Sequence, residues 1–309
     1  MTVKIEKIEY KGWQNCYRVA NGAIELIVTG DVGPRILRCG FAGGQNLFKE
    51  FSEQMGKSNE SDFQPRGGHR LWKAPEDFAT TWAADNVPIE VRLTASGLTA
   101  LSPVEPASGL RKEIEVAMAS STSEVTVTHR ITNCSPHELT FAPWALTMMA
   151  TGGVAICAFP PRTAYPGNLL PTNPLVMWGY TDLSDTRFTL TRKYLVLRQE
   201  VNKSNPQKVG LFNENTWASY LLNGELFTKY AKSFRSAIYP DYGCSFETFT
   251  NHEFLELETL GPVRVVPPGR SVEHIERWSL HRGVRLTAFT DDAIDRQLLP
   301  LVRANADVE

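Results

Sequence analysis

The chain has 309 residues, of which 42% are hydrophobic and 21% are charged, a balance typical of a globular protein with a substantial core. Its formal net charge is −2 and its lysines and arginines are scattered, which argues against a nucleic-acid-binding surface. No apolar run reaches the roughly 18–20 residues of a membrane span, and the opening MTVKIEKIEYKGW lacks the apolar stretch of a signal peptide. We therefore expect a cytoplasmic protein, monomeric or homodimeric, that binds neither nucleic acid nor membrane.

Cysteine and histidine are dispersed along the chain. The five cysteines form no CxxC pair, so we expect buried free thiols rather than disulfides or a zinc site. The six histidines form no HxH or HxxxH pair. The sequence therefore predicts no metal site.

The first third of the chain predicts short strands and one long irregular segment. Asn21-Gly22 is a hairpin signal between strands at 16–20 and 23–29, and residues 35–41 form the next predicted strand. Residues 49–88 lack periodicity and contain the motif GGHRLW. We interpret them as a functional loop, ordered by its aromatic residues.

The rest of the chain alternates with period two and predicts further strands. Asn223-Gly224 gives a second hairpin signal, and His129 is expected to be a core or cross-strand residue. Helical periodicity is confined to residues 291–305, where Pro300 is expected to kink or shorten the helix. Without a linker or a composition break, residues 1–309 are predicted to form one antiparallel β domain.

The stretch NHEFLELETLGP at 251–262 also alternates, so Phe254, Glu256 and Glu258 share one face of a strand. Two carboxylates two residues apart lie roughly 7 Å from each other. Such a pair forms either a solvated acidic face or a site in which one carboxylate serves as a general base.

Three stretches together resemble the galactose mutarotase-like (aldose 1-epimerase) superfamily, in particular a bacterial branch of mutarotase-like proteins. They are NGAIELIVTGDVGPRILRCGF near the start, GGHRLW, and LETLGP followed by PPGRSVEHIERWSL. The resemblance implies an antiparallel β-supersandwich with an open sugar-binding cleft. It also implies interconversion of sugar anomers by one acid and one base, without a cofactor.

Carried over residue by residue, the resemblance makes Glu258 the catalytic base, with Glu256 as the fallback. Trp144 stands where the family has its general-acid histidine, and an indole N–H cannot act as that acid. His69 is then the candidate acid, because histidine titrates in the required range. Arg70, Glu258 and His69 are predicted to meet in one cleft.

Other residues are candidates for binding the sugar. Arg70 and Arg35 are expected to reach its polar groups, Trp72 and Trp144 to stack on its C–H face, and Asp241 to contact a hydroxyl. The alternatives are a loop salt bridge for Arg70 and core packing for the tryptophans.

Two functions follow, with a weaker third. The first is a mutarotase-like enzyme, and the second is a carbohydrate-binding protein of the same fold that has lost its acid. The third, a glycoside hydrolase or lyase accessory domain, needs a second carboxylate across the sugar, whereas Glu256 lies beside Glu258 on the same strand.

Overall fold

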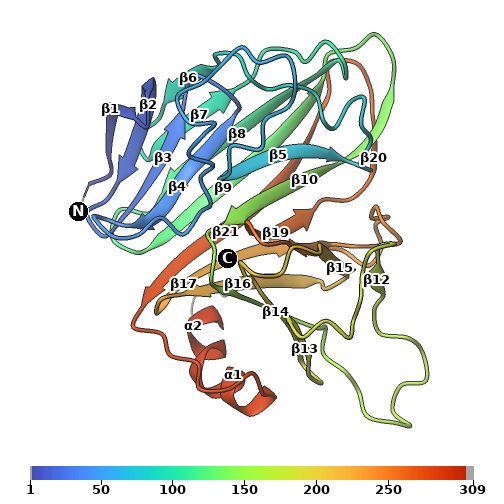
Figure 1. Cartoon of the computed structure of the whole chain (residues 1–309). Helices are drawn as coiled ribbons and strands as arrows, with labels where there is room; N and C mark the ends of the chain where they lie inside the picture. Colours follow the sequence, from blue (N-terminus) through green and yellow to red (C-terminus); the bar gives the residue numbers. More distant parts are fainter. Residues whose placement is uncertain (1, 304–309) are drawn as a thin grey trace.

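A computed structural model of the chain describes residues 2–303, with residue 303 described in its backbone only. Antiparallel β-strands form two large sheets (Figure 1). Two short helices, α1 (Asp291–Gln297) and α2 (Leu299–Arg303), follow the last strand. The predicted all-β, antiparallel supersandwich with a short C-terminal helix is thereby confirmed.

The first sheet has eleven strands. In spatial order they are β1 (Lys4–Tyr10), β2 (Trp13–Ala20), β3 (Ile24–Thr29), β4 (Arg35–Phe41), β5 (His69–Ala74), β10 (Leu139–Met149), β19 (Leu255–Leu260), β18 (Phe246–Thr250), β15 (Gln207–Leu211) and β12 (Leu175–Met177), with β20 (Arg264–Val266) paired to β10.

The second sheet has ten strands. Their spatial order is β13 (Phe188–Leu190), β14 (Tyr194–Arg198), β11 (Val154–Ala158), β16 (Asn215–Leu222), β17 (Glu225–Lys232), β21 (Ser271–Arg282), β9 (Glu124–Asn133), β8 (Leu110–Met118), β7 (Gly97–Leu101) and β6 (Glu90–Leu93).

Both predicted hairpins are present. β2 pairs with β3 around Asn21-Gly22, and β16 pairs with β17 around Asn223-Gly224. Asn223 and Gly224 have φ values of 51° and 79°, as a two-residue turn with positive φ at both positions requires. Local turn chemistry therefore sets the register of these strand pairs.

The interpretation of residues 49–88 as one functional loop is partly wrong. His69–Ala74 within it forms β5, which lies between β4 and β10 inside the first sheet. Both faces of β5 are covered by the protein, and five of its six residues are buried. A strand covered on both faces need not alternate between polar and apolar residues, so periodicity could not reveal it.

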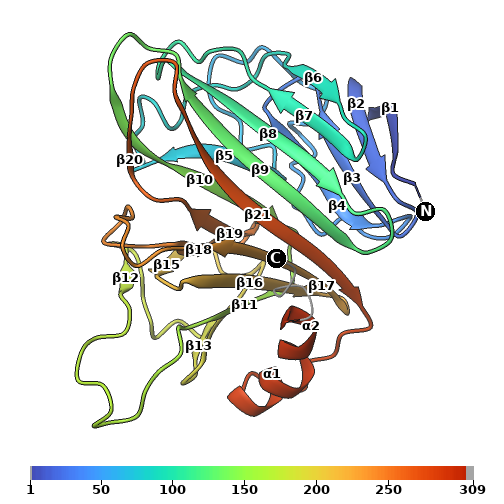
Figure 2. The ribbon, with the colours of Figure 1, turned by 180° about the vertical axis from the view of Figure 1, so that it is seen from behind.

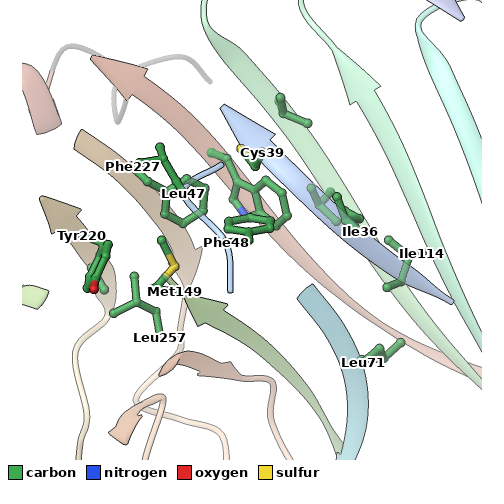
Figure 3. Close-up of a cluster of buried hydrophobic side chains, with 14 of the residues drawn as sticks. Ile36, Cys39, Leu47, Phe48, Leu71, Ile114, Met149, Tyr220, Phe227 and Leu257 are labelled. Atoms are coloured by element: carbon green, nitrogen blue, oxygen red, sulfur yellow. The ribbon is translucent and has the colours of Figure 1, made fainter. Parts of the chain in front are cut away.

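A large apolar core joins the inner faces of the two sheets. Figure 3 shows part of it, where Phe48 from the segment after β4 lies among side chains from both sheets. The Phe48 ring meets the rings of Phe227 at 5.4 Å and Trp278 at 5.7 Å, both edge to face. The core contains side chains from both sheets, which agrees with the single domain expected over residues 1–309. That single domain stays a prediction.

The end of the chain and the cysteines differ in part from expectation. The predicted helix over 291–305 is broken at Leu298, just before Pro300, and Asn305 lies outside the described residues. Four cysteines are buried and free as expected, but Cys134 is exposed. Among the described residues, no helix is long and apolar enough to cross a membrane.

Polar side chains also lie between the sheets. Figure 2 shows the long strand β21 from behind. His274, Glu276 and Trp278 on this strand are buried and point inward. Lys229 on β17 is fully buried, and its ammonium lies 2.6 Å from Glu276 Oε1. This ion pair is the centre of a network that we call the interior network.

Three histidines belong to the interior network. His69 Nε2 lies 2.6 Å from His129 Nε2, and His69 Nδ1 lies 2.8 Å from the hydroxyl of Thr147, which Lys229 also contacts. His274 Nε2 lies 2.6 Å from the Thr259 hydroxyl, which donates to Glu276. His129, predicted as a core residue, is fully buried, and its Nδ1 bonds to the backbone oxygen of His274.

The interior network makes the stability of the fold depend on pH. Burial lowers the pKa of His69 and of His129, and it lowers that of His274 to about 3. Below about pH 6.5 these histidines bind protons in the unfolded chain but stay neutral in the folded chain. The free energy of unfolding therefore falls as the pH falls. The slope per histidine approaches about 1.4 kcal/mol per pH unit only below the pKa of the unfolded side chain, so between pH 7 and pH 5 we expect urea unfolding to show a loss of at most about 2 kcal/mol per histidine.

A matched pair of variants isolates this effect. His274→Gln removes one titrating group but keeps a side chain able to bond to Thr259, so the slope of stability against pH should decrease. His137→Gln, at an exposed position, should leave the slope unchanged. Equal slopes for both variants would contradict the assignment.

Candidate functional site

Side chains from five neighbouring strands share the face of the first sheet that points away from the interior network. β5, β10, β19, β18 and β15 lie side by side in that order, and Figure 1 shows β5, β10 and β19 adjacent. Alternation along each strand selects which residues face this side. They are Arg70 and Trp72, then Trp144, then Glu256 and Glu258, then Glu247, then Lys208.

Register places the key groups in a row across the sheet. Leu146 on β10 is the partner of both Arg70 and Glu258, and Glu258 is the partner of Glu247 on β18. Glu247 in turn lies opposite Gly210 on β15. A Cβ at Gly210 would meet Cys244 Sγ at 2.5 Å, so only glycine fits beside Glu247.

Lys208 joins two carboxylates of this row. Its ammonium lies 2.7 Å from Glu247 Oε2 and 3.0 Å from Glu258 Oε2. Glu258 Oε2 also accepts a 3.0 Å hydrogen bond from the indole N–H of Trp144. A separate pair joins Arg70 Nη2 to Glu256 Oε1 at 3.0 Å. We call Arg70, Glu256, Glu258, Glu247 and Lys208 the charged cluster.

The charged cluster is withdrawn from water, which sets its protonation. Burial raises the pKa of Glu247 well above its usual value, although Lys208 opposes the shift. Burial also raises the pKa of Glu256 to about 7, against the effect of Arg70. Burial alone would lower the pKa of Lys208, but Glu258 and Glu247 raise it well above the usual value. Lys208 is therefore a charged ammonium at neutral pH.

Aromatic rings surround the two cations. The Lys208 ammonium lies 4.7 Å from the ring centroids of both Trp144 and Trp178. The Arg70 guanidinium carbon lies 4.3 Å from the ring of Trp72. Tyr180, which is 44% exposed, lies near enough for Lys208 and the cluster carboxylates to affect its pKa. The cluster thus lies beneath partly exposed aromatic side chains, the kind that stack on flat or C–H-rich ligands.

Several buried polar atoms of the charged cluster make no hydrogen bond within the described part of the chain. They are Nε and Nη1 of Arg70, Oε1 of Glu258, and both Oε1 and Oε2 of Glu247, whose contact with Lys208 is an ion pair. Buried polar atoms in native proteins nearly always have a partner. These donors and acceptors fit a polar ligand that carries hydroxyl groups.

The structure brings together most of the residues predicted from the sequence. Arg70, Trp72, Trp144, Glu256 and Glu258 share this face. Arg70 pairs with Glu256 rather than with an acidic residue of its own segment. Its partner therefore comes from a strand 186 residues further along the chain.

Asp241 lies near the cluster, whereas Arg35 is engaged elsewhere. The charge of Asp241 contributes to the raised pKa of Glu247. Arg35 is fully buried and bonds to Asp85 at 2.8 Å and to the backbone oxygens of Pro65 and Gly67. Arg35 therefore holds the segment before β5 in place.

The expectation that His69 meets Arg70 and Glu258 in one cleft is not met. His69 and Arg70 are consecutive in β5, so their side chains point to opposite faces. His69 is fully buried in the interior network, with both ring nitrogens bonded there. It cannot reach a ligand on the face of Glu258, so the prediction of His69 as the acid is wrong.

Sequence reasoning did not find Lys208 and Glu247. Lys208 lies in the short strand QKVGL and Glu247 in FETFT, where each looks like an ordinary polar residue in an alternating run. Only the pairing of β15 with β18 and of β18 with β19 brings them to Glu258. No local signal marks that pairing.

One group of side chains has the composition of a metal site. His69, His129 and Glu276 offer ligand atoms within 4.8 Å of one another, although the sequence predicted no metal site. The two imidazole nitrogens lie 2.6 Å apart, closer than the roughly 3.3 Å between two ligands of a tetrahedral ion. Lys229 already supplies a cation to Glu276, so these residues form a hydrogen-bond network.

Solved structures with the same architecture are galactose mutarotase-like. A candidate aldose 1-epimerase from Klebsiella pneumoniae matches with a TM-score of 0.57 and 10% identity, over 99% of this chain and 88% of its own. A galactose mutarotase related enzyme from Lactobacillus acidophilus matches with a TM-score of 0.52 and 11% identity, over 87% and 98%. A candidate aldose 1-epimerase from Escherichia coli matches with 0.51 and 13%, over 87% and 99%.

These likenesses define the fold, which is that of the galactose mutarotase-like proteins, as the resemblance in the sequence implied. No protein-family model matches the sequence. No curated protein matches it at a significant level.

The charged cluster predicts a strong effect of removing Lys208. Lys208→Met leaves two buried carboxylates without their cation, and breaking a buried pair costs about 3–5 kcal/mol. We expect the free energy of unfolding, measured in urea at pH 8, to fall by that amount. The loss should shrink toward pH 5, because protonated carboxyls need no cation.

Lys193→Met is the matched control. Lys193 also contacts a carboxylate, that of Asp295, but it lies on the surface, where ion pairs contribute little. Its removal should leave stability nearly unchanged. A Lys208→Met protein as stable as Lys193→Met would show that the carboxylates do not depend on Lys208.

Proposed function

We propose that this protein binds a monosaccharide, or a sugar derivative, on the charged cluster and interconverts its anomers. The observation that supports this most is Glu258. It is a fully buried carboxylate on a rigid central strand, held by Trp144 and Lys208 through Oε2 and with Oε1 free of partners in the described structure. The galactose mutarotase-like fold agrees with a sugar ligand.

In the proposed reaction, Glu258 takes the proton of the C1 hydroxyl while an acid protonates the ring oxygen. The C1–O5 bond breaks as the C1–O1 double bond forms, C1 rotates, and the ring closes with the other configuration. The free donors of Arg70 hold sugar oxygens, and the half-buried Trp178 provides apolar surface, whereas Trp72 and Trp144 are buried in an apolar cluster as the core-packing alternative expects. The reaction as written needs no cofactor.

A non-catalytic carbohydrate-binding protein of the same fold is the second candidate. The position of Trp144 favours it, because an indole N–H donates to Glu258 where the family resemblance expects an acid histidine. The accessory-domain hypothesis gains no support. Glu256 and Glu247 both lie beside Glu258 on one sheet face, rather than across a ligand from it. The cytoplasmic location and the monomeric or homodimeric state remain predictions.

Glu258→Gln tests the base. Glutamine keeps the size and hydrogen bonds of the side chain but cannot take a proton, and loss of a general base costs about 10²–10⁴-fold in rate. We expect this loss in anomer interconversion, followed by NMR exchange with D-glucose, D-galactose and D-glucuronate, while titration calorimetry still detects sugar binding.

The same sugars separate the two candidates. An unmodified protein that binds a sugar but never accelerates its mutarotation above buffer would be the non-catalytic protein. A Glu258→Gln variant as fast as the unmodified protein would remove Glu258 from the reaction.

A further inference from the structure

We propose that Glu247 is the general acid of this site, so that Glu247 and Glu258 form an acid–base pair arranged around Lys208. This inference rests on the proposed mutarotase function and supplies the acid that His69 and Trp144 cannot be. It assigns the role of proton donor to Glu247 on β18, a strand that contains none of the sequence motifs on which the family resemblance rests.

Geometry supports the pair first. Glu247 and Glu258 are direct partners on adjacent antiparallel strands, and their side chains emerge on the same face. One ammonium contacts both, at 2.7 Å and 3.0 Å, so the two carboxyl groups lie close together. In a pyranose, the C1 hydroxyl oxygen and the ring oxygen are bonded to the same carbon. Two neighbouring carboxyl groups can therefore serve both oxygens from one side.

The balance of charge around Lys208 also supports the acid–base pair. Glu247 and Glu258 are both fully buried, and Lys208 supplies a single positive charge between them. If both carboxyls were ionised, one buried negative charge would stay uncompensated, which is costly. One proton shared by the pair brings the three groups to neutrality.

The surroundings assign that proton to Glu247. Glu258 receives the indole N–H of Trp144 as well as the ammonium of Lys208, and donors favour an ionised carboxylate. Glu247 receives only the ammonium, and it faces the charge of Asp241 from the loop before β18 and the Cys244 thiol. Burial accordingly raises the pKa of Glu247 well above its usual value.

The other groups nearby are less suited to protonate the ring oxygen. The two carboxylates raise the pKa of Lys208 well above its usual value, so its ammonium releases a proton only with difficulty. Burial raises the pKa of Tyr180 to about 12. Glu256, with a pKa of about 7, is excluded by position and not by acidity: it is paired with Arg70 and lies two residues along β19 from the row that holds Glu258 and Glu247.

The proton balance of the step closes within the pair. Glu258 gains the proton of the C1 hydroxyl, the C1–O5 electron pair moves to the ring oxygen, and that oxygen takes the proton of Glu247. The result is an open-chain aldehyde, a protonated Glu258 and an ionised Glu247, with Lys208 again between one charged and one neutral carboxyl. Ring closure runs the same transfers backwards. The total charge around Lys208 never changes, so no buried charge has to be created.

The experiment compares Glu247→Gln with the unmodified protein and with Glu273→Gln. Glu273 lies on β21, where its exposed carboxylate pairs with Arg130, so this control makes the same chemical change outside the site. We expect Glu247→Gln to lose about 10²–10⁴-fold in the rate of anomer interconversion and to keep a cooperative unfolding transition. Glu273→Gln should keep the full rate.

A second readout does not depend on activity. Infrared spectroscopy of the unmodified protein at neutral pH should detect the C=O stretch of protonated carboxyl groups. The part of this band that belongs to Glu247 should be lost in Glu247→Gln and kept in both Glu256→Gln and Glu273→Gln.

The outcomes separate this inference from the proposed function. A folded Glu247→Gln variant at full rate, beside an inactive Glu258→Gln variant, overturns the role of Glu247 and leaves the mutarotase function standing. A carboxyl band unchanged in Glu247→Gln overturns the proton assignment directly. An unmodified protein inactive on every sugar overturns the proposed function and this inference together.

Discussion

The ammonium of Lys208 is the group on which the charged cluster depends. An ionised carboxylate is costly in this water-poor face of the sheet without a cation beside it, and Lys208 contacts both Glu247 and Glu258. It also lies over the rings of Trp144 and Trp178, and Trp144 in turn packs edge to face against Trp72.

A second buried lysine, Lys229 on β17 of the other sheet, contacts the opposite face of strands β10 and β19. Lys229 reaches between the sheets and bonds to the backbone oxygens of Ala145 and Leu257, the residues next to Trp144 and Glu258. The Lys229 ammonium thus contacts β10 and β19 from the interior, and the Lys208 ammonium contacts Glu258 on the outer face of β19. This double fixation makes the backbone beneath Glu258 rigid, which suits a group that has to be positioned within hydrogen-bond reach of a proton.

Much of the fold could be predicted from the sequence, because turn chemistry and alternation are local. Asn21-Gly22 and Asn223-Gly224 mark hairpins that the structure contains, and Leu255–Leu260 alternates as a strand with Glu256 and Glu258 on one face. The exception among the elements is β5, which is covered on both faces and begins with His69 and Arg70. Its polar residues have buried partners elsewhere in the chain, and periodicity cannot report such partners.

The candidate site could be predicted only in part, for the same reason. Arg70 and Glu258 were assigned to one site through a family resemblance. Lys208 and Glu247 depend on strand pairings that no local pattern encodes. The predicted position of the His69 side chain is wrong, because consecutive residues of a strand point to opposite faces of the sheet. A motif such as GGHRLW therefore identifies a segment, and only strand register decides which of its residues can reach the ligand.

The tryptophan at position 144 acquires a role from this register. The indole N–H is a donor only, and it donates to Oε2 of Glu258, the oxygen that Lys208 also contacts. The other carboxylate oxygen of Glu258 makes no hydrogen bond within the described residues. In the acid–base pair proposed above, the proton rests on the neighbouring carboxyl, Glu247. What looks in the sequence like a lost catalytic residue is, in the folded sheet, consistent with a proton donor moved by two strands.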